Sequence, residues 1–182
     1  MFPLIAVGLL VVFFLGGSAL KSNYPDIDPN KQGGTFKKDY DFFFKHAADS
    51  AGVPFALVKA HAIAESSLNP LAFTDESNTG SNRDGWASRG LMQVLWWPDS
   101  DRFEKYGFPD DMLEEGELLH DPNTNTLIGA CIIRDNLARF KNVRDAINAY
   151  NTGKSEADHP APNNYVNKVI GYYKQLTGDN TL

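Results

Sequence analysis

Cysteine is almost missing from this chain of 182 residues, and the single copy, Cys131, excludes a disulfide within the chain. Cys131 lies in the apolar stretch 127–133, which favours a small core residue over a nucleophile. The 4 histidines show no metal-ligand spacing, and no HExxH or CxxC pattern occurs. We therefore expect neither a disulfide nor a metal site.

A clustered basic surface is also missing. The chain has 17 Lys and Arg residues against 23 Asp and Glu residues, which gives a net charge of −6. Nucleic-acid binding proteins usually present a basic stripe, so nucleic acid is a poor candidate partner. With 42% hydrophobic residues the chain can bury a core. A neutral or weakly charged polymer is the partner that this balance favours.

The N-terminus is the clearest break in composition. Residues 2–20 are almost wholly apolar, about the length that crosses a bilayer as a helix. We expect residues 1–21 to be a transmembrane anchor that contacts lipid through residues 2–20. The alternative is a cleaved signal segment, with Gly17-Ser18-Ala19 as its processing site, but no basic residue precedes the apolar run.

The rest of the chain divides into a linker, residues 22–36, and one globular domain, residues 37–178. The linker contains prolines and glycines without apolar periodicity. The domain pattern is mainly α, because apolar residues recur at helical spacing and no long alternating strand pattern occurs. The predicted helices cover residues 37–51, 54–65, 121–140, 143–150 and 165–176. A short helix is expected to begin in residues 90–94, and the polar loop 68–87 has room for a small hairpin.

Glu65 is the first catalytic candidate. It follows the apolar run Ala62-Ile63-Ala64 at the end of a predicted helix. A carboxyl group that faces a cleft there would lose hydration, which raises its pKa and keeps its proton available near neutral pH. Protonation of a glycosidic oxygen requires such a group.

Five short motifs share their order with one known family. Glu65–Ala72 resembles the catalytic-glutamate motif of the soluble-type (SLT) lytic transglycosylases, within the lysozyme-like superfamily. Ser88–Gln93 resembles the Gly-Leu-Met-Gln motif of that family, and Asp121–Asn125 the start of its long buried helix. Ala149–Gly153 resembles its Ala-Tyr-Asn-x-Gly motif, and Asn164–Val169 its closing helix. The resemblance implies a lysozyme-like fold for the globular domain.

The resemblance also implies roles for individual residues. Glu65 would be the catalytic acid and base, and the hydroxyl of Tyr150 would approach and orient its carboxyl. Met92 would form an apolar wall of the sugar cleft, and Gln93 would line it as a donor and acceptor. The full set of implied substrate-binding residues is Ser66, Ser88, Met92, Gln93 and Asn151.

The implied reaction needs one carboxylate. The bond between N-acetylmuramic acid (MurNAc) and N-acetylglucosamine (GlcNAc) in peptidoglycan is cut without water. The N-acetyl carbonyl of MurNAc stabilises the charge that develops at the anomeric carbon, and the muramic 6-hydroxyl closes onto that carbon to give a 1,6-anhydro product. This mechanism uses no metal and no organic cofactor.

Two segments depart from the family pattern. Residues 73–87 look like an insertion that carries Asp75, Glu76 and Asp84. If one of these carboxylates activated water, the enzyme would hydrolyse its substrate like a goose-type lysozyme. After Gln93 come Trp96 and Trp97, which either stack on sugar rings or pack in the core.

Two further alternatives concern activity and setting. The domain could be an inactive wall-binding or structural module that kept the fold. A bacterial envelope enzyme and a phage virion or lysis protein fit the sequence equally well. Either setting places an anchored catalytic domain facing peptidoglycan.

Overall fold

The computed structural model describes residues 40–80, 83–113 and 116–178, and this part is mainly helical, as predicted. Its α-helices are α1 (Asp41–Ala51), α2 (Phe55–Ser66), α3 (Pro122–Arg139), α4 (Val143–Thr152) and α5 (Tyr165–Thr177). Its strands are β1 (Phe73–Asp75), β2 (Ala87–Arg89) and β3 (Val94–Trp96). Its short 3₁₀ turns are η1 (Ser77–Thr79), η2 (Glu104–Tyr106), η3 (Asp110–Leu113), η4 (Glu117–His120) and η5 (Pro162–Asn164).

The predicted anchor, residues 1–21, and linker, residues 22–36, lie outside the described residues. Within the described ranges, no helix combines the length and the apolar character that a bilayer span requires.

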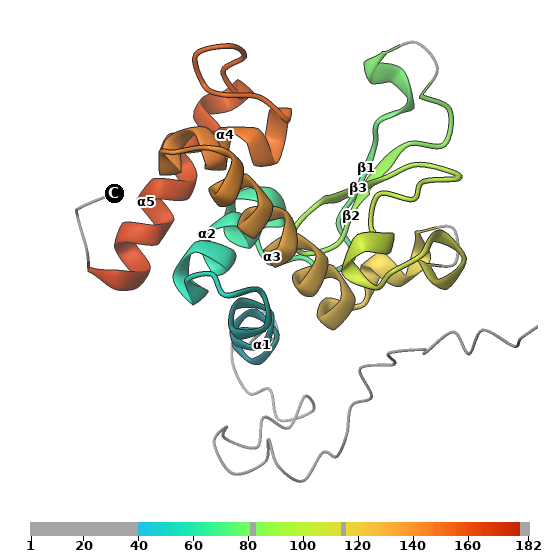
Figure 1. Cartoon of the computed structure of the whole chain (residues 1–182), viewed down its shortest axis with the longest axis horizontal. Helices are drawn as coiled ribbons and strands as arrows, with labels where there is room; N and C mark the ends of the chain where they lie inside the picture. Colours follow the sequence, from blue (N-terminus) through green and yellow to red (C-terminus); the bar gives the residue numbers. More distant parts are fainter. Residues whose placement is uncertain (1–39, 81–82, 114–115, 179–182) are drawn as a thin grey trace, which may run out of the picture. The chain divides into compact units, whose positions relative to one another are not determined.

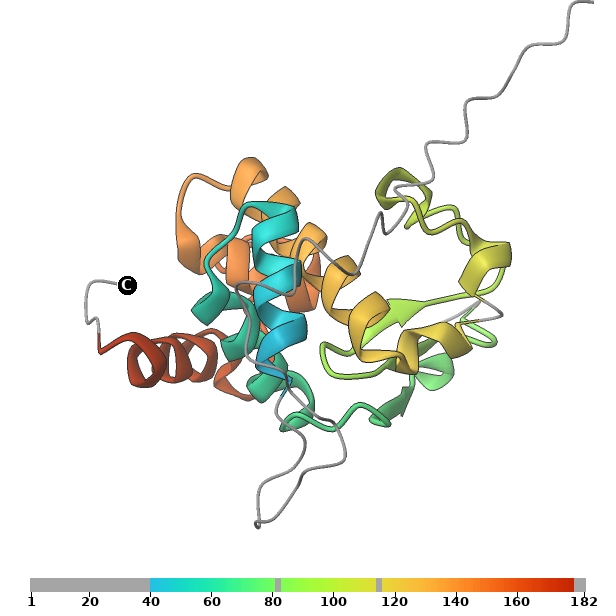
Figure 2. The ribbon, with the colours of Figure 1, turned by 90° about the horizontal axis from the view of Figure 1, so that it is seen from below.

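Helix α3 joins the two halves of the domain. The five α-helices gather on one side and the small sheet with η2, η3 and η4 lies on the other (Figure 1). Figure 2 shows α3 reaching from one side to the other, and it contacts both α1 and β3. Seven residues of α3 are buried, so this helix forms the centre of the core.

The helix ends follow the signals in the sequence. Gly52 ends α1 in the left-handed conformation with φ 71°, which glycine adopts without steric cost. The Asp121 side chain accepts a hydrogen bond from the Thr124 backbone N–H at 2.8 Å, and Pro122 follows it as the first residue of α3. These boundaries therefore depend on local signals in the sequence.

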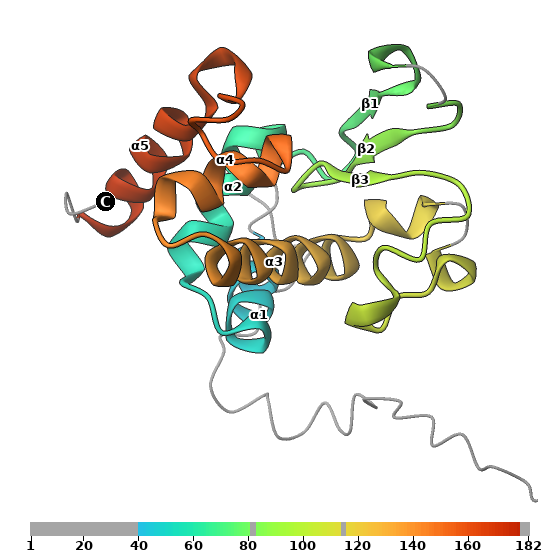
Figure 3. The same cartoon turned by 45° about the horizontal axis from the view of Figure 1, so that its top comes forward.

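The sheet is antiparallel, in the order β1-β2-β3, with three residues in each strand. Strands this short give no readable alternation, so the sequence indicated only a hairpin. The β1–β2 hairpin and the α4–α5 loop project on the same side of the domain (Figures 1 and 3). Residues 73–80 and 83–87, within the segment that looked like an insertion, belong to this projecting hairpin.

The prediction that a short helix begins in residues 90–94 is wrong. Residues 90–93 form the turn between β2 and β3, with Gly90 at φ 77° and Gln93 at φ 45°, and Val94 begins β3. Fully buried Asn125 of α3 holds the turn, because its side chain accepts from the Met92 N–H at 2.7 Å and donates to the Arg89 carbonyl at 2.8 Å. Contacts with a distant helix thus override the local pattern.

Replacing Gly90 by alanine should destabilise the domain more than replacing Gly52, although both residues have positive φ. At Gly90 an added Cβ would lie 2.3 Å from the Leu119 carbonyl oxygen, whereas at Gly52 it would meet nothing within 4 Å. We expect Gly52→Ala to cost about 1–2 kcal/mol through the backbone conformation alone. Gly90→Ala should cost at least about 3 kcal/mol, because the neighbouring backbone must also shift. Urea unfolding of the full chain measures both losses, and equal losses would contradict this account.

Candidate active site

Glu65 lies in the last turn of α2, where the chain reverses sharply. Ser67 and Leu68 follow in the left-handed conformation, with φ 52° and 61°. The Ser66 hydroxyl donates to the Leu91 carbonyl at 2.6 Å, which ties the end of α2 to the β2–β3 turn. Ser66, expected beside the sugar, therefore uses its hydroxyl to fix the position of its neighbour Glu65.

The Glu65 carboxyl is held by a tyrosine from the far end of the chain. The Tyr165 hydroxyl donates to Glu65 Oε1 at 2.6 Å, across 100 residues of sequence. Glu65 keeps part of its surface open. Even so, desolvation raises its pKa to about 7, while the Tyr165 hydrogen bond lowers the pKa and the charge of Glu76 raises it. A carboxyl group with this pKa can donate and accept a proton near neutral pH.

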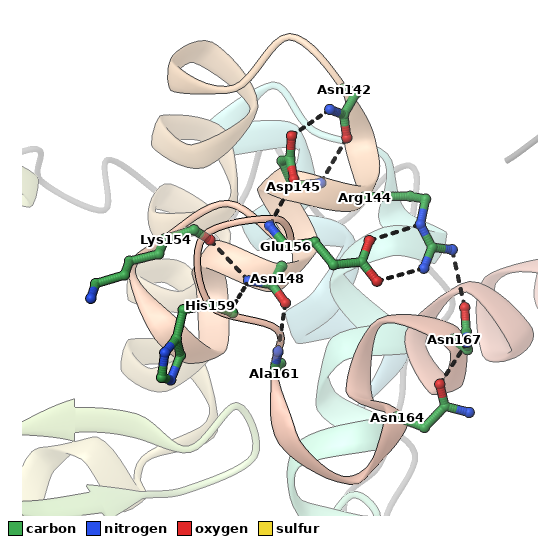
Figure 4. A network of polar contacts seen from close by, with 10 residues as sticks. All are labelled: Asn142, Arg144, Asp145, Asn148, Lys154, Glu156, His159, Ala161, Asn164 and Asn167. Atoms are coloured by element: carbon green, nitrogen blue, oxygen red, sulfur yellow. Dashed lines mark hydrogen bonds and ion pairs between the residues drawn. The ribbon is translucent and has the colours of Figure 1, made fainter.

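The α4–α5 loop positions Tyr165, the first residue of α5. Fully buried Asn148 of α4 organises this loop (Figure 4). Its amide nitrogen donates to the Lys154 carbonyl at 3.0 Å and to the His159 carbonyl at 2.9 Å. Its oxygen accepts from the Ala161 N–H at 2.8 Å. Because the loop leads directly into α5, these bonds fix where Tyr165 begins its helix.

A second group of side-chain contacts, made by Arg144, joins α4, the α4–α5 loop and α5. The Arg144 guanidinium contacts both carboxylate oxygens of Glu156, at 2.9 and 2.8 Å, and the Asn167 side-chain oxygen at 3.0 Å (Figure 4). The planar fork of arginine matches a carboxylate in this two-point geometry. The Arg144–Glu156 ion pair is partly exposed, so its contribution to the stability of the fold is modest.

Tyr150, expected to orient Glu65, has a different partner. Its hydroxyl donates to the Met92 carbonyl at 2.9 Å. Burial raises the pKa of Tyr150 well above its ordinary value, and the charge of Glu65 raises it further, so the two groups are neighbours. Tyr165, not Tyr150, makes the hydrogen bond to Glu65. The sequence placed Tyr165 in the closing-helix motif but gave no signal of this contact.

Comparisons with known proteins identify the family of this domain. The family model described as the transglycosylase SLT domain matches residues 42–169. The chain belongs to this family. It is similar to the invasion protein IagB of Salmonella typhimurium, strains SL1344 and LT2, with 32% identity over 122 residues, 67% of this chain and 69% of the relative. It is also similar to IagB of Salmonella typhi, with 32% identity over 120 residues, 66% of this chain and 68% of the relative. No solved structure matches.

In the Gly-Leu-Met-Gln turn of this SLT domain, the Met92 and Gln93 side chains contact other protein groups. Met92 has no exposed surface, so it is a core residue and not the expected wall of a sugar cleft. Gln93 donates to the Ala72 and Gly90 carbonyls, each at 3.2 Å, and accepts from the Thr74 hydroxyl at 2.6 Å. Its side chain therefore joins the turn to β1.

Two other residues expected to bind substrate lie at different depths. Ser88 is buried in β2, and its hydroxyl donates to a Glu76 oxygen at 3.2 Å. Asn151 is exposed in the last turn of α4.

Within residues 40–80, 83–113 and 116–178, no group of three His, Cys, Asp or Glu side chains could hold a metal ion.

The two tryptophans that follow the turn pack against protein groups. Trp96 is buried, with the Arg89 guanidinium 5.1 Å from its ring centre. Trp97 stacks on Trp86 with ring centres 4.6 Å apart, and the Arg102 guanidinium lies 5.4 Å from its ring. Of the two roles left open for them, the structure supports packing.

Replacing Tyr165 by phenylalanine should raise the pKa of Glu65 above about 7. The hydroxyl stabilises the charged carboxylate, whereas the remaining ring preserves burial. Titration of the Glu65 side-chain carboxyl carbon by NMR measures the change. Tyr173→Phe, on the same helix, serves as the control and should leave the pKa unchanged. A fall in the pKa of Glu65 in Tyr165→Phe would contradict this assignment.

Replacing Glu65 by glutamine should stabilise the fold at pH 8. Because the folded-state pKa of Glu65, about 7, lies above its ordinary value of 4.5, the free energy of unfolding falls as the pH rises from about 4.5 to about 7, and the full loss is present at pH 8. Below about pH 4.5 the carboxyl is protonated in both states, and this advantage of glutamine should disappear. Thermal unfolding at pH 4 and pH 8 compares the variant with the parent. An equal stability difference at both values would contradict the burial argument.

Proposed function

We propose that this SLT domain is a peptidoglycan lytic transglycosylase that cleaves the MurNAc–GlcNAc bond and forms 1,6-anhydro-MurNAc, with Glu65 as its single acid and base. The observation that carries the proposal is a desolvated Glu65 carboxyl, with a pKa of about 7, held by one tyrosine hydroxyl. Such a group is protonated often enough to act as an acid and ionised often enough to act as a base. Membership of the SLT family supports peptidoglycan as the substrate.

The proposed reaction uses the same carboxyl group twice. Protonated Glu65 gives its proton to the glycosidic oxygen as the bond to the MurNAc anomeric carbon breaks. The N-acetyl carbonyl of MurNAc stabilises the positive charge there. The Glu65 carboxylate then removes the proton of the muramic 6-hydroxyl, whose oxygen bonds to the anomeric carbon. The Tyr165 hydrogen bond favours the ionised form between these steps.

The full chain should release 1,6-anhydro-muropeptides from purified peptidoglycan, and mass spectrometry identifies them. Glu65→Gln should lower release at least about 100-fold, because removal of a general acid typically costs two to four orders of magnitude. The matched control is Glu104→Gln, which changes an exposed carboxyl in η2 and should retain parent activity. Undiminished release by Glu65→Gln would overturn the proposal.

Hydrolysis is a second candidate function, and one observation favours it. Glu76 follows β1 in the projecting hairpin, accepts the Ser88 hydroxyl and acts on the pKa of Glu65 through its charge. A second carboxylate near the first could activate a water molecule and leave a reducing end on the product. Asp75 and Asp84, the other carboxylates of residues 73–87, are exposed.

The Glu76→Gln variant separates the two reactions. In a hydrolase it should abolish the reducing-end product. In a transglycosylase it should preserve the anhydro product and lower the pKa of Glu65, because a neighbouring negative charge is removed. The activity profile would then move towards acid pH.

An inactive wall-binding module would show binding to peptidoglycan without cleavage in the parent chain.

We further propose that residues 2–20 anchor the protein in a membrane, with the SLT domain facing peptidoglycan. The apolar character of this segment supports the anchor. The relatives named above are proteins of a bacterium, which favours a bacterial envelope over a phage virion. Co-sedimentation with membranes, lost on deletion of residues 2–20, tests the anchor. Detection in purified phage particles would support the alternative setting.

A further inference from the structure

His61 is a buried histidine that the proposed reaction does not use. It lies in α2, four residues before Glu65, and therefore one helical turn away on the same face. Only 1% of its surface is exposed. A polar ring at such a depth beside a candidate acid needs a physical explanation.

Hydrogen bonding sets the tautomer of this ring. Nδ1 lies 2.8 Å from the Leu57 carbonyl oxygen, which can only accept, so Nδ1 carries a proton. Nε2 is buried without a hydrogen-bond partner. Burial lowers the pKa of His61 to about 4, so the ring is neutral near pH 7.

The His61 ring contacts both tyrosines of the site. Its centre lies 4.9 Å from the ring centre of Tyr150, at an angle of 58°. Its distance to the ring centre of Tyr165 is 6.3 Å, with an edge-on angle of 67°. Aromatic pairs favour such tilted arrangements, and each adds to the stabilisation that burial supplies. His61 thus supports the ring whose hydroxyl holds Glu65.

We propose that His61 is a positioning residue: its neutral ring packs against Tyr150 and Tyr165 and keeps the Tyr165 hydroxyl on Glu65. The packing of the ring against the two tyrosines carries the effect, and the hydrogen bond of Nδ1 sets the tautomer. This inference rests on the proposed function only where its test measures the rate of glycan cleavage.

The neutral state of His61 matters because its charge would change the protonation of Glu65, the proposed acid and base. Glu65, Tyr150 and Tyr165 are its neighbours on α2, α4 and α5. A positive charge at this position would favour the Glu65 carboxylate and remove the proton that the acid must donate. An uncharged aromatic ring supports Tyr165 without this effect.

Two substitutions separate the ring from its hydrogen bond. His61→Phe keeps an aromatic ring and loses both nitrogens, whereas His61→Asn keeps a donor near the position of Nδ1 and loses the ring. We expect His61→Asn to lower kcat roughly tenfold or more with little change in KM, because misplacement of a positioning group impairs the chemical step. His61→Phe should stay within roughly threefold of the parent. Phe44→Leu, in the core on α1, controls for lost stability alone.

A double-mutant cycle with Tyr165→Phe tests the route of the effect. If His61 acts through the Tyr165 hydroxyl, His61→Asn should change kcat and the pKa of Glu65 far less in the Tyr165→Phe background than in the parent. Full additivity would overturn the proposal, as would a His61→Phe variant as impaired as His61→Asn. A parent that cuts no glycan would defeat the proposed function, but the NMR titration of Glu65 across the same variants would still decide the role of His61.

Discussion

The hydrogen bond from the Tyr165 hydroxyl to the Glu65 carboxyl is the interaction on which the site depends. Burial favours the protonated form of Glu65, and the tyrosine restores part of the stabilisation that water would give the carboxylate. The balance of these opposing effects leaves a pKa of about 7. One carboxyl group can then serve as acid and base in turn, as the single-carboxylate reaction requires.

Much of the domain serves to bring these two residues together. Glu65 is placed by the end of α2, which the Ser66 hydroxyl ties to the β2–β3 turn. That turn is itself fixed by Asn125, at the centre of the core. On the opposite side, Asn148 orders the loop that leads into Tyr165. Buried side-chain amides therefore position the site from both sides, because each satisfies several backbone groups at once.

The sequence predicted the parts of this arrangement that depend on local signals. Gly52 and the Asp121 cap marked helix boundaries correctly, and the motif around Glu65 led to the SLT family, which the comparisons confirm. The β2–β3 turn was mistaken for a helix because the hydrogen bonds of Asn125 come from 33 residues away. Tyr165 was missed for the same reason, since its contact spans 100 residues. The roles of individual residues in binding sugar remain proposals.

The most direct test compares two pH dependences in the full chain. One is the NMR titration of the Glu65 carboxyl, and the other is the rate of glycan cleavage from soluble peptidoglycan strands. The account predicts that Glu65 titrates near pH 7 and that kcat/KM falls on the basic side with the same apparent pKa. Titration of Glu65 near 4.5, or cleavage that continues undiminished after Glu65 has ionised, would contradict the central claim.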